Sequence, residues 1–375
     1  SDVCSSDLER KKDRDTQRGH GPSAQPKLPI VEVVHSLNEA DKACPSCGGE
    51  MSEMAGQFEE SEEVDVVERS FRVVRHKRTK YRCACGCAIV TAPAPAKLIE
   101  GGRYSIAFAV EVALAKYLMH MPLARQVRQM ERQGLVVSTQ TLWDQLFALG
   151  EPLGPSYEAL HEVVRESPVI GADETTWKLM EGGASKTWWA WSISSERGVY
   201  HHIHASRGLE AAEAILGSYA GVVVCDGYTA YSALEKKRRH SPTGPAPPVL
   251  AHCWSHVRRK FFEAAPHDKR ATEALDLIDR LFAVEAEANE TAGDSLCSRR
   301  AELRSTRSRE AVQEFRRWML AQRALPRSAL GRAISYADGI WVGLCRFLDH
   351  PGVPIHNNAS ERALRGIALG RKNHY

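Results

Sequence analysis

Three acidic residues stand in contexts that could bring their carboxylates together. Asp173 ends the apolar run 169–172, and Asp226 ends a second apolar run, 222–225. If the two runs form neighbouring strands of one sheet, both carboxylates lie at the same edge of that sheet. The third acid, Glu361, lies far downstream in a polar segment. We expect the three to meet at one site, with Asp173 at the tip of its strand and facing solvent.

Three carboxylates at one point repel one another unless cations lie between them. Mg²⁺, or Mn²⁺ in its place, prefers carboxylate and phosphate oxygens. Two such ions, about 3.5–4 Å apart, can hold the attacking and leaving oxygens of a phosphodiester. The trio therefore predicts a metal-dependent site that cuts and rejoins DNA. In this hypothesis Asp173 bridges two ions, while Asp226 and Glu361 hold one each.

The sequence around Glu361 predicts the start of a helix. Asn358 is a natural N-cap, which places Glu361 in the first turn. An acid there can also serve only the helix dipole, or pair with Arg365 one turn further on. Taken alone, this structural interpretation would be preferred, as would a surface position for Glu174. The catalytic interpretation depends on the conjunction of two strand-end aspartates with a capped helix that carries a glutamate.

Length and composition limit the possible classes of protein. A chain of 375 residues is too long for one ordinary core, so two or three domains are expected. The formal net charge is only +3, so any basic surface must be local. No apolar run is long enough to cross a bilayer, and the first residues are too polar for a signal peptide. Five of the ten cysteines lie between Cys44 and Cys87, which favours a cytoplasmic protein with one metal site over a disulfide scaffold.

The clustered cysteines predict a structural zinc site. A C-x-x-C pair is separated from a second, irregular cluster by strand-like sequence such as 71–74. Zn²⁺ takes four thiolate or imidazole ligands in such modules, and four thiolates leave no position open for water. Reduced cysteines in a loop are the alternative. The expected ligands are four of the five residues Cys44, Cys47, Cys83, Cys85 and Cys87.

Helical periodicity between residues 106 and 149 predicts three helices. Pro122 opens the second, Gly134 ends it, and Ser138 can cap the third. The arrangement resembles a helix-turn-helix, in which the start of the last helix approaches the bases of DNA. A plain helical bundle is the alternative. In the first interpretation the base-reading residues are Thr139, Gln140 and Thr141.

Residues 168–265 alternate between strand and helix patterns. The strand of Asp173 is followed by strand patterns at 187–194 and 199–204, a helix at 209–216, strands at 221–226 and 249–252, and a helix at 254–264. Three strands, a helix and two further strands predict a ribonuclease H-like mixed sheet. In that layout the first and fourth strands are adjacent, and their tips carry Asp173 and Asp226.

The chain is thus predicted to be an α/β multidomain protein built from six segments. They are a disordered lead-in (1–29), a zinc-ribbon-like module with a proline-containing linker (30–96), a helical, helix-turn-helix-like DNA-binding region (97–166), the first part of a ribonuclease H-like core (167–265), a helical insertion (266–350) and the helix of Glu361 (351–375).

Basic residues near the acids are the expected DNA contacts, since neutralisation of backbone phosphates supplies most non-specific affinity. Residues 299–332 contain ten arginines and three glutamates, which fits a surface that follows phosphates, although a solvated helix face is the alternative. His256 is expected to pack beside the acids or to hold a phosphate. The full set of expected DNA contacts outside the helix-turn-helix is His256, Arg258, Arg259, Lys260, Arg362, Arg365, Arg371 and Lys372.

Several of these segments are similar to those of insertion sequence 66 family transposases, which belong to the DDE class. The similarity extends from about Leu28 to the last residue. It is carried by CPSCGG, APAP, KYLMHMPLARQ, ADET, CDGYTAY, HCWSHVRRKF and IHNNASERALRGIALGRKN. The resemblance implies that Asp173, Asp226 and Glu361 form a catalytic triad, with a zinc-finger-like region in front and a helical insertion before Glu361.

The resemblance also implies partners and a location. We expect binding to element terminal repeats and target DNA, a homo-oligomer on DNA, and a bacterial, nucleoid-associated protein in the cytoplasm. Accessory proteins from the same element could take part. Family members usually continue beyond the position of Tyr375 and carry an N-terminal coiled region, so the chain is expected to be a fragment.

Three other functions are alternatives to DNA transposition. The first is a catalytically inactive or truncated remnant that only binds DNA. The second is a ribonuclease H-like nuclease without strand transfer. The third is a glycoside hydrolase that uses an acid pair, which would give no role to the zinc module or to the arginine-rich insertion.

Overall fold

The computed structural model describes residues 32, 46–47, 52, 70–82, 89–181, 184–241, 243–291 and 295–373. The chain divides into two compact units, Ser1–Glu68 and Arg69–Tyr375. Of the predicted zinc ligands, Cys47 is exposed in a turn. The other four, Cys44, Cys83, Cys85 and Cys87, lie outside the described residues.

A short hairpin and a helical region precede the large sheet. β1 (Lys80–Arg82) pairs antiparallel with β2 (Ile89–Thr91), whereas residues 71–79 form no strand, so the expected strand at 71–74 is wrong. The helices that follow are α1 (Ile106–Ala113), continued by the π-helical turn η2 (Leu114–Leu118), then α2 (Leu123–Arg132) and α3 (Thr139–Arg165).

Three helices with a capped third one are present, as predicted. The Ser138 hydroxyl accepts a hydrogen bond from the Thr141 N–H at 3.1 Å, which satisfies one free donor at the start of α3. Buried residues of α1, α2 and α3, among them Val112, Met130 and Leu142, form a small core of their own. α3 is longer than expected because it continues through two prolines.

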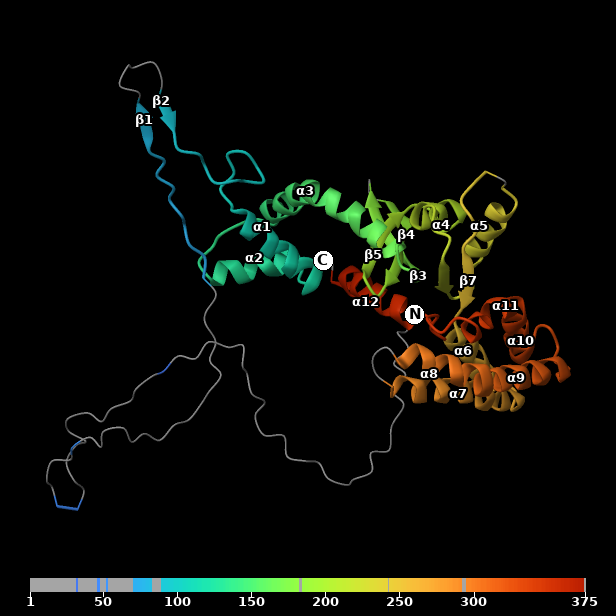
Figure 1. Cartoon of the computed structure of the whole chain (residues 1–375). Helices are drawn as coiled ribbons and strands as arrows, with labels where there is room; N and C mark the ends of the chain where they lie inside the picture. Colours follow the sequence, from blue (N-terminus) through green and yellow to red (C-terminus); the bar gives the residue numbers. More distant parts are fainter. Residues whose placement is uncertain are drawn as a thin grey trace. The chain divides into compact units, whose positions relative to one another are not determined.

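A mixed five-stranded sheet has the strand order β5-β4-β3-β6-β7 (Figure 1). β3 and β4, and β4 and β5, pair antiparallel, while β3, β6 and β7 are parallel. The first and fourth strands along the chain are therefore neighbours, as predicted. The strands are β3 (Val169–Glu181), β4 (Ala184–Ser195), β5 (Gly198–His204), β6 (Val222–Cys225) and β7 (Val249–His252).

Alternate residues of the parallel strands enter two separate cores, because side chains along a strand point to opposite faces. Ile170, Val223 and Leu250 pack with residues of α3, α4 (Leu209–Leu216) and α5 (Thr229–Arg239). α5 was missed in the sequence. Val224 and Ala251 belong to the core of the opposite face, which the downstream helices form.

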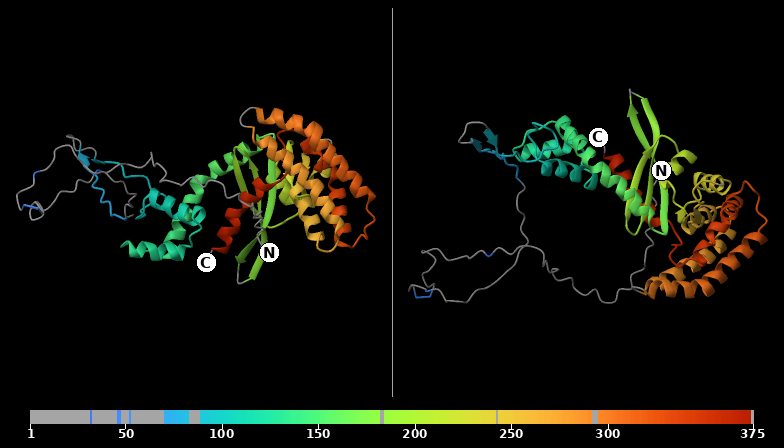
Figure 2. Two further views of the ribbon diagram at one scale, coloured as in Figure 1. Left: turned by 90° about the horizontal axis from the view of Figure 1, so that it is seen from below. Right: turned by 45° about the horizontal axis from the view of Figure 1, so that its top comes forward.

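Those helices cover the second face as one packed group (Figure 1). They are α6 (Trp254–Ala264), α7 (Arg270–Asn289), α8 (Ser295–Leu303), the π-helical turn η3 (Arg304–Ser308), α9 (Arg309–Ala321), α10 (Ala329–Gly339), α11 (Trp341–Leu344) and the 3-10 turn η4 (Arg346–Leu348). α12 (Asn358–Lys372) contacts β3 and β4, and both views of Figure 2 show it beside these strands.

A buried arginine fixes the loop between this helical group and α12. Arg304 is fully buried and pairs with Glu285 through two nitrogens, at 2.6 and 2.7 Å. Its remaining nitrogen donates to the carbonyls of Phe347 (2.9 Å), His350 (3.2 Å) and Val353 (3.0 Å). The loop that leads to Glu361 is therefore held by a charge inside the protein.

Most arginines of the arginine-rich stretch pair with acidic residues of the same chain, and several of these pairs lie at the surface. The arginines that pair with acidic residues are Arg299, Arg300, Arg304, Arg307, Arg309 and Arg316. An intramolecular role therefore describes this stretch better than a phosphate-tracking surface. Among the helices of the described part of the chain, none combines the length and apolarity needed to span a membrane.

Candidate active site

Asp173 lies inside a long strand. β3 continues to Glu181, so the expectation that Asp173 ends its strand is wrong. Pairing of β3 with β6 ends at Gly171, opposite Val224, whereas pairing with β4 continues to the end of the strand. Asp173 thus lies two residues beyond the point where β3 separates from β6. Its side chain shares a face with Gly171, on the side of α12.

Asp226 directly follows β6, which ends one residue earlier than predicted, and is held by two contacts. The Tyr228 N–H donates to Asp226 Oδ1 at 2.8 Å, and the Tyr336 hydroxyl of α10 donates to the Asp226 carbonyl. Gly227 has a φ of +90°, a conformation that favours glycine. A Cβ at Gly227 would also lie 3.0 Å from Ile340 Cγ2. The turn after Asp226 is therefore tightly specified.

Glu361 reaches the site because α12 packs closely against β3. A Cβ at Gly171 would lie only 2.0 Å from Ser360 Oγ, so this approach requires glycine. The Asn357 side chain donates to the Ala172 carbonyl at 2.9 Å, and the Asn357 N–H donates to Cys253 Sγ at 3.2 Å. The N-cap residue is Asn357 and not Asn358 as predicted, and its side chain bonds to β3 instead of capping the helix.

The three acids act on one another electrostatically. The pKa of Asp173 is raised from 3.8 to about 7, first by burial and then by the negative charge of Glu174. The charges of Asp226 and Glu361 raise it further, while a hydrogen bond from the Glu174 N–H opposes the shift. The charges of Asp226 and Glu361 therefore reach Asp173, although the three acids are not among the described groups whose ligand atoms all lie within 4.8 Å of one another.

Glu174 is not the surface residue that its type suggested. Its side chain is 1% exposed and pairs with Arg207 at 2.8 Å, and the Tyr231 hydroxyl donates to its other oxygen at 3.0 Å. The Arg207 guanidinium lies over the rings of Trp189 and Tyr228, with distances of 4.6 and 4.0 Å to their centroids. This network fixes β3 next to Asp173. Its members are far apart in the sequence, so no local pattern predicts it.

His256 and Cys253 lie against Glu361. His256 Nε2 is 3.7 Å from Glu361 Oε1, with side-chain exposures of 19% and 35%. Burial lowers the pKa of His256, while the charges of Glu361 and Asp226 raise it. Burial raises the pKa of the Cys253 thiol, and hydrogen bonds from nearby backbone N–H groups oppose this. Among the described residues, Cys253, His256 and Glu361 are the one potential metal-binding group whose ligand atoms all lie within 4.8 Å.

The predicted DNA contacts differ in availability. Arg258 forms two hydrogen bonds with Asp279, at 2.6 and 3.0 Å, so its guanidinium is already paired within the protein. Arg371 likewise donates to the Thr176 carbonyl. The side chains that remain exposed are Arg259, Lys260, Arg362, Arg365 and Lys372, of which Lys260 lies 3.7 Å from Glu263.

The start of α3 presents its predicted base-reading residues unevenly. Thr139 and Gln140 are exposed, and the Gln140 side chain donates to Asp144 at 2.8 Å. Thr141 is partly buried and its hydroxyl bonds with that of Ser138 at 2.9 Å. Thr141 therefore serves the cap, while the other two face solvent.

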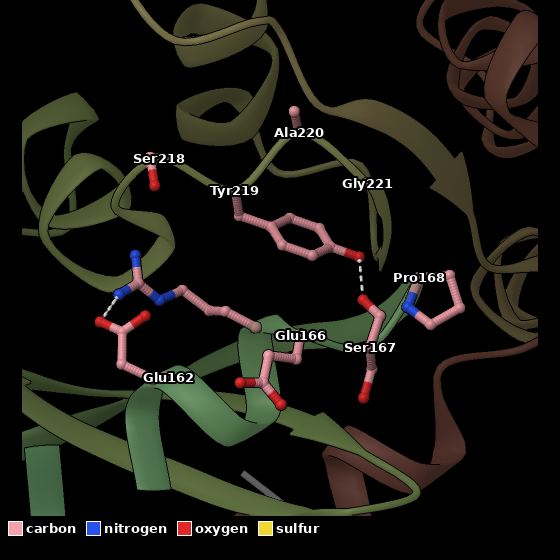
Figure 3. Close-up of a pocket in the computed structure, with 9 residues that line it drawn as sticks. Glu162, Glu166, Ser167, Pro168, Ser218, Tyr219, Ala220 and Gly221 are labelled. Carbon is pink, nitrogen blue, oxygen red and sulfur yellow. Dashed lines mark hydrogen bonds and ion pairs between the residues drawn. The ribbon is translucent and has the colours of Figure 1, made fainter. Parts of the chain in front are cut away.

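A shallow cavity of about 380 Å³ lies at the N-terminal ends of β3 and β6, the ends away from Asp173 and Asp226 (Figure 3). It is bounded by the end of α3 and by the residues that precede each strand. The Tyr219 hydroxyl crosses it to donate to the Ser167 carbonyl at 3.0 Å, and Arg165 pairs with Glu162 on its wall. With four residues in β6, this cavity is about 13 Å from the acids along the strands. It is not part of the acidic site.

The chain resembles known proteins over nearly all of its length. Residues 101–375 match the family described as "Transposase IS66 family", and residues 41–86 match the "zinc-finger binding domain of transposase IS66". Three relatives come from Sinorhizobium fredii (strain NBRC 101917 / NGR234). The uncharacterized protein y4jD is 31% identical, covering 99% of this chain and 75% of the relative. The uncharacterized proteins y4qI and y4hP are 32% and 28% identical, covering 92% and 94% of this chain and 65% and 67% of theirs.

Proposed function

Because the chain belongs to the transposase IS66 family, we propose that its acidic site cleaves DNA at the ends of an insertion element and joins those ends to target DNA. The proposed catalytic residues are Asp173, Asp226 and Glu361. The observation that carries the proposal is the meeting of three elements: β6, which Asp226 follows, pairs with β3 up to Gly171, and the start of α12 packs against the same Gly171. Three acids delivered by three separate elements to one neighbourhood are costly to the fold, and a function explains why they are there.

The donor set fits hard divalent cations. The site offers carboxylate oxygens, which Mg²⁺ and Mn²⁺ prefer, and like charges that a cation would relieve. The proposed holders are Asp173, Asp226 and Glu361. Divalent ions bound there would stabilise the charge on the scissile phosphate and activate the attacking hydroxyl group.

The fold of the chain would hold the three carboxylates in place for this chemistry. Asp173 is fixed within a strand that is paired to β4 on one side, and Asp226 is held by Tyr228 and Tyr336. Glu361 is placed by the contact of α12 with Gly171. Carboxylates on rigid elements hold a reacting geometry better than carboxylates on loops. In the sheet, β3 and β4, and β4 and β5, are antiparallel neighbours, and β6 and β7 run parallel to β3. This arrangement supports a ribonuclease H-like core.

DNA is the proposed partner. The match of residues 41–86 to a zinc-finger domain supports a structural Zn²⁺ held by four of the five clustered cysteines. The exposed Thr139 and Gln140 at the start of α3 are proposed base contacts of a helix-turn-helix-like region. Arg259, Arg362 and Arg365, which are exposed near the acids, are proposed phosphate contacts.

Purified protein with Asp226→Asn tests the catalytic proposal. The variant should bind element-end DNA as the wild type does and fail to nick it in Mg²⁺, because one carboxylate ligand becomes a neutral amide. Asp276→Asn is the matched control, since Asp276 is exposed on α7, and it should cleave normally. Cleavage by the Asp226→Asn protein would remove that acid from the mechanism. Binding without cleavage by the wild type would instead indicate a DNA-binding remnant, and cleavage without joined products would indicate a nuclease.

A further inference from the structure

A thiol, an imidazole and a carboxylate meet beside the acidic site. The ligand atoms of Cys253, His256 and Glu361 all lie within 4.8 Å of one another. Cys253 immediately precedes α6 and His256 lies in its first turn, three residues on, a spacing that places both on one side of a helix. Glu361 comes from α12. The cluster therefore joins two elements that are far apart in the sequence.

The separations suit a tetrahedral ion with mixed ligands. With metal–sulfur bonds of about 2.3 Å and metal–nitrogen or metal–oxygen bonds of about 2.0–2.1 Å, tetrahedral Zn²⁺ places its ligand atoms about 3.3–3.6 Å apart. The distance from His256 Nε2 to Glu361 Oε1 is already 3.7 Å. Closing the cluster around an ion thus requires side-chain adjustments of about 1 Å. Mg²⁺ needs oxygen ligands, so a thiol and an imidazole select a softer ion.

Two polar atoms in the cluster lack hydrogen-bond partners within the described part of the chain. Glu361 Oε1 and His256 Nδ1 are both buried at the atomic level and neither has a partner there. A buried acceptor that is left unsatisfied costs about 1–3 kcal/mol. Glu361 Oε1 faces His256 across the gap, so an ion between them would satisfy it. Access is open from the side of Glu361, whose side chain is 35% exposed, while Cys253 is fully buried behind it.

We propose that Cys253, His256 and Glu361 form a Zn²⁺ site that competes with the catalytic cations for Glu361. On binding, the Cys253 thiol releases its proton to solvent and the thiolate coordinates the ion. Three protein ligands leave the fourth tetrahedral position to water. The competition, though not the binding, rests on the proposed function. Zinc bound here draws Glu361 away from Asp173 and Asp226 and inhibits cleavage in Mg²⁺.

Cobalt binding to the full chain tests the site without relying on catalysis. Co²⁺ replaces Zn²⁺ and absorbs in the near ultraviolet when a thiolate binds it, so thiolate sites can be counted. The cysteines between Cys44 and Cys87 contribute to the signal, so the comparison is between variants. Cys253→Ser should bind one fewer equivalent of Co²⁺ than the wild type. Cys297→Ser, which changes an exposed cysteine, should match the wild type.

Two further variants keep the test decisive. His256→Gln leaves the buried Cys253 in place. It should bind Co²⁺ at this site at least about tenfold more weakly than the wild type. Asp226→Asn should retain that equivalent even though it cannot cleave, which separates this site from the catalytic one. Equal cobalt binding by the wild type, Cys253→Ser and His256→Gln, all folded by circular dichroism, would overturn the proposal.

Zinc inhibition tests the competition. Each protein is compared with its own cleavage rate in Mg²⁺ without zinc. Cys253→Ser should need at least about tenfold more Zn²⁺ than the wild type for half inhibition. Equal zinc sensitivity would refute the competition. If no protein cleaves DNA but Cys253→Ser still loses one cobalt equivalent, the zinc site stands and the proposed transposase activity fails.

Discussion

Replacing Gly171 with alanine tests whether the contact between β3 and α12 sets the separation of the acids. The added Cβ would lie 2.0 Å from Ser360 Oγ, where ordinary contacts begin at 3.4 Å, a shortfall of about 1.4 Å. It would also lie 3.0 Å from Asn357 Oδ1 and 3.1 Å from Ser194 Oγ. Ser360 is fully buried, and its hydroxyl bonds with that of Ser194 at 2.9 Å, so turning it away would break this buried hydrogen bond. The start of α12 therefore has to move away from β3 by about 1 Å or more.

Both stability and catalysis should fall by amounts that follow from this shift. Overpacking of a buried contact costs about 1–3 kcal/mol of the free energy of unfolding. A displacement of about 1 Å in a catalytic group can lower the rate about 100-fold. We therefore expect a loss of about 1–3 kcal/mol in urea unfolding and an approximately 100-fold slower cleavage of element-end DNA in Mg²⁺. DNA binding should change less than the cleavage rate, because the long, exposed side chains of Arg362 and Arg365 can adjust to a small shift of the helix.

A control variant and a rescue variant separate this effect from a general effect of adding a methyl group at a glycine. Gly150→Ala in α3 adds a Cβ with nothing within 4 Å, so it should keep the cleavage rate and gain up to about 1 kcal/mol in stability. Gly171→Ala combined with Ser360→Gly removes the nearest clashing atom and should recover part of both losses. Wild-type stability and rate in Gly171→Ala would refute the reasoning. Lost stability with an unchanged rate would show that the contact does not position Glu361.

Two further predictions concern buried charges. Arg304→Met should lower the free energy of unfolding by about 3–5 kcal/mol in urea denaturation, because Glu285 is left buried without its partner. The exposed pair of Arg309 with Asp349 is the control, and Arg309→Met should cost no more than about 1 kcal/mol. Since the folded pKa of Asp173 is raised from 3.8 to about 7, the folded state holds a proton that the unfolded state loses, so metal-free stability should fall as pH rises through that window. Asp173→Asn should flatten this slope in thermal unfolding with EDTA, and an unchanged slope would assign it to other groups.

Local sequence signals were sufficient for many elements. The bounds of α4, β7 and α6 were predicted as the structure has them. α4 begins after Gly208 and ends before Gly217, whose φ of +52° suits glycine. The adjacency of β3 and β6 also followed from the order of strands and helices. In these cases the determining interactions lie within a few residues, or within the connectivity of the sheet.

Other features depend on contacts between distant parts of the chain, which no local pattern contains. β3 extends past Asp173 because β4 pairs with it as far as Glu181, and that register belongs to both strands. Glu174 is buried because Arg207 and Tyr231, 33 and 57 residues away, bind its carboxylate. Asn357 replaces Asn358 at the start of α12 because the Ala172 carbonyl is within reach of its side chain. From the sequence alone, Asn357 and Asn358 are equally suitable as the N-cap of this helix.

These distant contacts share one physical property that matters for the acids. Like charges repel, so acids left to themselves would separate, and the fold holds the elements that carry them largely by bonds to other groups, although Asp226 Oδ1 also accepts the Tyr228 N–H. Asn357 ties α12 to β3 and to Cys253 through its amide groups, and Gly171 sets how near α12 can come. The Tyr336 hydroxyl donates to the backbone carbonyl of Asp226 and not to its side chain. The fold therefore opposes the repulsion through neutral contacts. The Glu361 carboxylate is left available either to the catalytic cations or to an ion bound by Cys253 and His256.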